Sequence, residues 1–234
     1  MDGATPSPQG IATAGEPPVA RPLWRVAYDG LAFLLSAVLS PYIVIPVGTV
    51  GIVYARGHQN YPPATLLLWA GLSVFFSTVV PALYVLWGMR RGKITDVHVM
   101  EREQRFGPFF VAVVSSIFSA LVLWKLGAPP SVCGLSVVIG ANGIVLWAIT
   151  SVYKISIHVS VLSAVVLAAV TLHPGFSPQA FWLVPALIWA RSTRKRHSLK
   201  QGILGCLVAC FITSLTLIGL HMGDRLVQML HRAF

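Results

Sequence analysis

Long apolar segments alternate with short polar connections along most of the chain. Most of the segments are close to the roughly 20 residues that an α-helix needs to cross the hydrocarbon core of a bilayer. They occupy residues 31–54, 64–88, 109–126, 132–153, 155–172, 178–190 and 202–222. This pattern predicts an all-α, polytopic bundle of seven transmembrane helices, or six if the fourth and fifth segments are partly re-entrant.

Composition supports a membrane protein and leaves no room for a soluble domain. Of the 234 residues, 56% are hydrophobic and 10% are charged, and the mean hydropathy is +0.75. Residues 1–22 are rich in Pro, Gly, Ala, Ser and Thr and lack the cationic start and apolar core of a signal peptide. We expect a disordered tail over residues 1–22 and a helical membrane domain over residues 23–234.

The net charge of +10 comes from short connections between apolar segments. A nucleic-acid partner is therefore disfavoured, and the charge is better explained by membrane topology. With seven spans, most Lys and Arg residues fall on the side that also carries the N-terminal tail. The positive-inside rule predicts that this side is cytoplasmic and that the C-terminus is outside. The size of the chain and the absence of eukaryotic targeting signals favour a bacterial inner membrane.

Three polar stretches, residues 93–105, 154–158 and 191–201, are predicted to lie on that same cytoplasmic face. A basic run beside a membrane helix often does no more than fix topology. Three cationic stretches gathered at one face can also surround a multiply charged anion, because Arg binds phosphate as a fork and Lys as a point charge. Two histidines in such a group, His158 and His197, can divide the nucleophile and general-acid roles.

The spacing within these stretches resembles the three motifs of the type 2 phosphatidic acid phosphatase superfamily. Arg191, His197 and Gln201 follow the family pattern Ser-Arg-x5-His-x3-Asp, with Gln in place of Asp. Ser156 and His158 keep the Ser-x-His core of Pro-Ser-Gly-His. The match to Lys-x6-Arg-Pro is the loosest, since neither Arg after Lys93 has the family spacing. Its candidate residues are Lys93, Arg102 and Arg105.

This resemblance implies a helical core with a metal-independent phosphatase site and no cofactor. It assigns His197 as the nucleophile that forms a phosphohistidine, and His158 as the acid that protonates the leaving group. It assigns phosphate binding to Lys93, Ser156, Arg191 and one of Arg102 and Arg105. Preset cationic donors of this kind stabilise the charge that builds on a transferring phosphoryl group.

Two departures from the family pattern affect the expected chemistry. The carbonyl of Gln201 can accept the imidazole N–H but supplies no negative charge. Glucose-6-phosphatases of the same superfamily resemble this chain in having Gln at that place. The Pro and Gly that precede the histidine of the second motif are also missing before His158, so the tight turn that they provide must be made otherwise.

The expected function is hydrolysis of a lipid phosphomonoester or of a prenyl or other lipid diphosphate at the membrane face. The alternative is a catalytically weak or inactive relative that binds anionic lipid headgroups or a partner protein. A small transporter is a further rival, but ionisable residues are nearly absent from the centres of the apolar segments. The substrate and the oligomeric state are left open.

Overall fold

The structure is a computed structural model that describes residues 22–97, 99, 101, 103–224 and 226–228. Over these residues the chain is all-helical, as the apolar segments predict. The tail predicted to be disordered lies outside the described residues apart from Pro22, and so does Arg102.

The first apolar segment forms two helices rather than one. Helix α1 spans Leu23–Val38 and helix α2 spans Pro41–Gly57, and their axes differ by 51°. Pro41 has no backbone N–H to continue α1, and Ser40 before it takes an extended conformation with φ −74° and ψ 153°. The segment predicted as one span over residues 31–54 is therefore a bent pair of helices that begins earlier, at Leu23.

The second apolar segment is one helical stretch with a local widening. It consists of α3 (Pro63–Val74), a π-helical turn η1 (Phe75–Val79) and α4 (Val80–Arg90). Pro81 explains the widening, because its ring would collide with the carbonyl of Ser77 in a regular α-helix. Such π-turns often mark functional sites.

The remaining segments form helices close to their predicted positions. After a short 3₁₀ turn η2 (Glu103–Arg105) come α5 (Phe106–Lys125), α6 (Pro130–Val152) and α7 (Ile157–Leu172). A second 3₁₀ turn η3 (Pro178–Trp182) leads into the short α8 (Leu183–Thr193), and α9 spans Leu199–Gly219.

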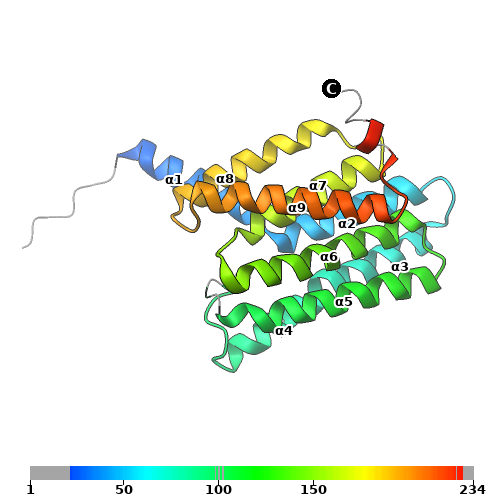
Figure 1. The fold of residues 1–234 in the computed structure, drawn as a ribbon, viewed down its shortest axis with the longest axis horizontal. Helices are drawn as coiled ribbons and strands as arrows, with labels where there is room; N and C mark the ends of the chain where they lie inside the picture. The colour runs from blue at the N-terminus through cyan, green and yellow to red at the C-terminus, as the bar shows by residue number, and fades with distance from the viewer. Residues whose placement is uncertain (1–21, 98, 100, 102, 225, 229–234) are drawn as a thin grey trace, which may run out of the picture.

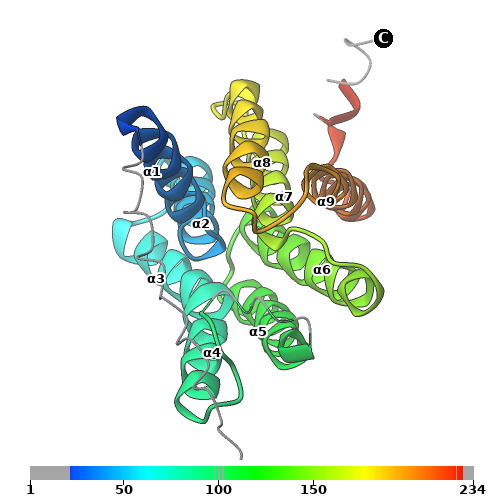
Figure 2. The ribbon, with the colours of Figure 1, turned by 90° about the vertical axis from the view of Figure 1, so that its left-hand side faces the viewer.

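Helix α7 lies inside the bundle and packs against α2, α6, α8 and α9 (Figure 1). The α4–α5, α6–α7 and α8–α9 connections lie together at the left-hand end of Figure 1, and Figure 2 views the molecule from that end. The three polar stretches that resemble the phosphatase motifs thus reach one end of the bundle.

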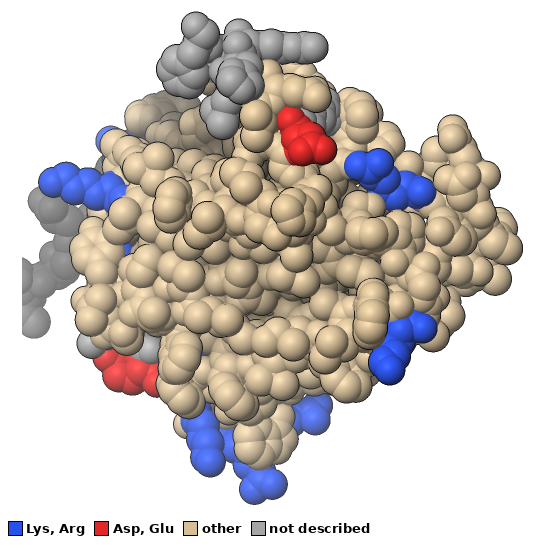
Figure 3. All heavy atoms as spheres, turned by 45° about the vertical axis from the view of Figure 1, so that its right-hand side comes forward, with Lys and Arg blue, Asp and Glu red and all other residues tan. Residues whose placement is uncertain are grey.

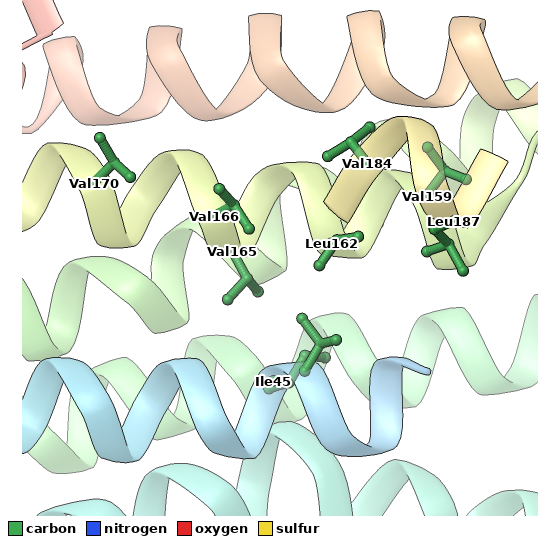
Figure 4. Close-up of a cluster of buried hydrophobic side chains, with 9 residues drawn as sticks. Ile45, Val159, Leu162, Val165, Val166, Val170, Val184 and Leu187 are labelled. Carbon is green, nitrogen blue, oxygen red and sulfur yellow. The ribbon is translucent and has the colours of Figure 1, made fainter. Parts of the chain in front are cut away.

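The core at the junction of α2, α7 and α8 is made of close-packed aliphatic side chains (Figure 4). Ile45 of α2 lies on the side of Leu162 and Val165 of α7, and Leu187 of α8 belongs to the same cluster. Gly48 lets α2 approach closely, because a Cβ atom there would lie 2.3 Å from Val165 Cγ1. This packing fixes α7, whose first turn carries His158.

Small and polar residues join α6 to its neighbours. The Asn142 amide donates to Thr213 Oγ1 of α9 at 3.0 Å, and the hydroxyls of Ser119 and Ser136 are 3.1 Å apart. Gly143 lies against α5, where a Cβ would be 2.9 Å from Val113 Cγ2. Close contact between small residues is typical of membrane helices.

The face of the molecule shown in Figure 3 is mostly uncharged. On α9, Leu207, Phe211 and Leu215 recur every four residues and are each more than half exposed. An apolar face of this kind suits contact with lipid. The helical stretches of the described chain that are long and apolar enough to span a membrane are Pro63–Arg90, Glu103–Lys125, Pro130–Val152 and Leu199–Gly219.

The bent pair α1–α2 would add a fifth candidate span. Helix α7 is apolar but has only 16 residues, and α8 has 11. The described helices therefore support a membrane protein with four or five candidate spans, and a count of six or seven stays a prediction.

Candidate functional site

The start of α9 holds His197 in one orientation. Ser198 is the N-cap of α9, its hydroxyl accepts the Gln201 N–H at 3.3 Å, and Gln201 Oε1 accepts the Ser198 N–H at 3.1 Å. Because the atom of the Gln201 side chain that accepts this N–H must be oxygen, the capping box fixes the orientation of the Gln201 amide. The same oxygen lies 3.1 Å from Nδ1 of His197. An oxygen can only accept, so Nδ1 carries the proton and Nε2 is left with a lone pair.

Arg191 lies in the last turn of α8 and is buried. Its Nη1 donates to the hydroxyl of Ser36 in α1 at 3.0 Å, and its Nε has no hydrogen-bond partner among the described residues. The Arg191 carbonyl accepts the N–H groups of Arg196 and His197 at 3.1 and 3.4 Å. The loop thus folds back on Arg191, so the arginine and the histidine of the third motif are held as one unit.

The α6–α7 connection brings the second motif to the same unit. The backbone N–H of Ser156 donates to the carbonyl of Gln201 at 3.3 Å, which ties this connection to the first turn of α9. Ser156 is fully buried, and its Oγ has no hydrogen-bond partner within the described chain. His158 follows in the first turn of α7 and is also buried.

Of the candidate residues of the first motif, the structure buries Arg105 but leaves Lys93 exposed. Arg105 is buried at the N-cap of α5, and its Nε donates to the carbonyl of Val99 at 2.9 Å. Lys93 is exposed, and its Nζ lies 5.9 Å from the centre of the Trp87 ring. Arg102, the third candidate from this motif, lies outside the described residues.

The electrostatic environment keeps His197 neutral. Burial, together with the positive charges of Arg191, Arg105 and Lys154, lowers the pKa of its imidazole from the ordinary 6.5 to about 4, while the hydrogen bond to Gln201 opposes the shift. These three cations belong to α8, the start of α5 and the α6–α7 connection. Stretches far apart in the sequence therefore act on one imidazole.

The structure adds residues that the sequence did not single out for binding. Ser36 sits in an apolar segment 155 positions from Arg191 and carries no motif. Asp96 is close enough to Arg191 and to Tyr42 to act on both electrostatically. No signal in the sequence alone links Ser36 to Arg191, because the contact depends on how α1 crosses α8.

The site is rich in cations and imidazole and poor in acidic ligands. In the part of the chain that the structure describes, no group of three or more His, Cys, Asp or Glu side chains could hold a metal ion. Cys133, Cys206 and Cys210 are free thiols within helices. The described donors are therefore suited to an anion.

Comparison of the chain with family models, with curated proteins and with solved structures finds no match. The resemblance to the type 2 phosphatidic acid phosphatase superfamily accordingly depends on the motif spacing alone.

Proposed function

We propose that the protein is a membrane phosphatase of the type 2 phosphatidic acid phosphatase kind, which removes phosphate from a lipid phosphomonoester or diphosphate. The observation that supports this most directly is the state of His197. The imidazole is neutral, its Nδ1–H is held by Gln201, and its Nε2 lone pair is available beside buried cations. These are the properties that a histidine nucleophile requires.

In the proposed reaction, Nε2 of His197 attacks phosphorus, and the bond to the leaving oxygen breaks. His158 gives its proton to that oxygen, and a phosphohistidine remains. Water then attacks the phosphohistidine, His158 takes a proton from the water, and inorganic phosphate leaves. Arg191 and Arg105 offset the charge on the phosphoryl oxygens throughout.

Gln201 fits this scheme as an orienting residue. Its carbonyl selects the tautomer with the proton on Nδ1, which is one of the two effects an Asp has in catalytic triads. It does not add the charge that would stabilise a positive imidazole. A neutral nucleophile needs the correct tautomer before attack, and the Gln201 amide provides it. The amide does not stabilise the positive charge that develops on the imidazole after attack.

Phosphate release from the purified protein in detergent tests the proposal. The substrate panel contains phosphatidate, phosphatidylglycerol phosphate and a prenyl diphosphate, with and without a metal chelator. We expect chelator-resistant release that His197→Ala lowers at least about 10³-fold, because the nucleophile is lost. The matched control is His58→Ala, which changes an exposed histidine at the other end of the bundle and should leave release unchanged.

The intermediate provides a second readout of the same proposal. Brief incubation with ³²P-labelled substrate and acid-free quenching should leave an acid-labile label on the peptide that contains His197. Absence of release from every substrate, combined with retained binding of anionic lipid, would overturn the enzymatic proposal and favour the lipid-binding alternative.

A further inference from the structure

A cavity of about 160 Å³ lies next to the candidate site, between α2, the π-turn η1, α5 and α7. Arg105 and His158 line it, and both belong to the proposed phosphate site. The cavity therefore begins at the cationic end of the bundle and continues between the helices.

Away from these two residues, the cavity wall is largely aliphatic and aromatic. Ile45 of α2, Ala112 of α5 and Val161 of α7 are among the residues that form it. The hydroxyl of Ser77 also lines the wall but donates to the Ser73 carbonyl at 2.6 Å within its own helix. Thr78 Oγ1 is buried with no hydrogen-bond partner among the described residues.

The cavity owes its position to the π-turn. An α-helix with one extra residue per turn bulges outward, and here the bulge over Phe75–Val79 places Ser77 and Thr78 in the wall. Pro81 favours this widening and thereby contributes to the hollow.

We propose that this cavity holds the first carbons of the hydrocarbon chain of a prenyl phosphate, whose phosphate lies at Arg105 and His158. This inference rests on the proposed phosphatase function and names its substrate class. A cation at one end and an apolar wall beyond it match a molecule with an anionic head and one hydrocarbon chain.

The size of the cavity selects one chain over two. A cavity of about 150 Å³ holds one benzene molecule, so about 160 Å³ accommodates a single five-carbon isoprene unit. A diacylglycerol phosphate would bring two chains and two ester carbonyls close to the phosphate. The Thr78 hydroxyl can donate to one of these carbonyls, and burying the other without a donor would weaken binding.

Kinetics with a filled cavity test this inference. Ala112→Leu should extend into the hollow and raise KM for farnesyl phosphate about tenfold or more, while kcat/KM for ethyl phosphate stays unchanged. Ala120→Leu, on the same helix but away from the cavity wall, is the matched control and should change neither value. Equal effects of both variants, or a loss of ethyl phosphate turnover in Ala112→Leu alone, would overturn the inference.

Photocrosslinking separates failure of this inference from failure of the phosphatase proposal. A farnesyl phosphate analogue with a diazirine in its first isoprene unit is added to the unmodified protein in detergent. We expect labelling of peptides around Ala112 and Val161 that farnesyl phosphate suppresses and dioleoyl phosphatidate does not. Such labelling without phosphate release would support the cavity as the binding site of the prenyl chain and reject the phosphatase proposal. If phosphate is released but labelling is confined to other peptides, the cavity is not the binding site of the prenyl chain. Equal suppression of labelling by phosphatidate would also reject this inference.

Discussion

At the scale of single residues, the candidate site depends on the burial of His197, which favours the neutral form of its imidazole. An imidazole in water is half protonated near pH 6.5, whereas burial beside Arg191 lowers the pKa of His197 to about 4. Bringing a phosphate dianion into the site would oppose this shift, because a negative charge favours the protonated ring. The neutral imidazole is therefore the form in which the proposed nucleophile would attack phosphorus.

The lowered pKa of His197 makes stability depend on pH. The unfolded chain takes up a proton near pH 6.5, and the folded chain does so only near pH 4, so folding loses stability as the pH falls from about 6.5 towards 4. At pH 4.5 the loss from this residue is on the order of 2 kcal/mol. Thermal unfolding in detergent at pH 7.5 and 4.5 should show a smaller acid shift for His197→Gln than for the unchanged protein. Identical acid shifts would mean that this imidazole titrates normally.

Contacts of the site between residues close in sequence could be predicted from the sequence, whereas contacts between residues far apart in sequence could not. His197 and Gln201 are four positions apart at a helix start, so their spacing was enough to predict the contact that the structure has. Ser36 and Arg191 are joined only because α1 crosses α8, and no local pattern encodes such a crossing. Lys93, chosen by a loose motif match, is exposed over Trp87.

At the scale of elements, the prolines decide where the apolar pattern and the helices differ. Hydrophobicity alone runs through Pro41, but the chain breaks there and bends by 51°. It also runs through Pro81, where the helix continues with a π-turn. The apolar pattern predicts that both regions are buried or in lipid, while the backbone chemistry of proline determines the local shape. The sequence does not indicate which of the two outcomes each proline takes, because neighbouring helices help to decide it.

Close contact between α7 and α9 joins the second and third motifs, and Gly205 makes it possible. A Cβ at Gly205 would lie 2.8 Å from Ser160 Oγ and 3.1 Å from the Ser156 carbonyl oxygen. The serine side chain can rotate, but the backbone oxygen cannot, so Gly205→Ala should push the helices apart and destabilise the protein by about 1–3 kcal/mol. Phosphate release should fall as well, because Ser156 and Gln201 are moved apart. Thermal unfolding and release assays in detergent measure the two effects.

The control for this change is Gly71→Ala in α3, where a Cβ would meet no atom within 4 Å. Replacing an unhindered helical glycine by alanine should stabilise the protein by about 0.5–1 kcal/mol. Opposite signs for the two variants would attribute the effect of Gly205→Ala to helix contact. A neutral or stabilising effect of Gly205→Ala would show that α7 and α9 have room to spare.

At the scale of the whole molecule, one buried helix is surrounded by helices with apolar outer faces. Fourteen residues of α7 are buried, from His158 to Leu172. A helix covered on all sides need not match the thickness of a bilayer, which explains why 16 residues suffice for α7. The connections at its two ends lie at opposite ends of the bundle (Figure 1), so the candidate site lies at one end of the bundle.

This arrangement predicts that residues at the two ends are reached from opposite sides of the membrane. Arg196→Cys, in the α8–α9 connection, and Asn60→Cys, in the α2–α3 connection, are each placed in a variant with Cys133, Cys206 and Cys210 replaced by Ala. A membrane-impermeant maleimide should label Arg196→Cys only in inverted vesicles and Asn60→Cys only in right-side-out vesicles, because basic connections remain cytoplasmic. The reverse pattern would keep the bundle spanning but place the site outside the cell. Labelling of both positions from one side would mean that the long axis of the bundle does not cross the bilayer. The exposed apolar face of α9 would then need an explanation other than contact with lipid.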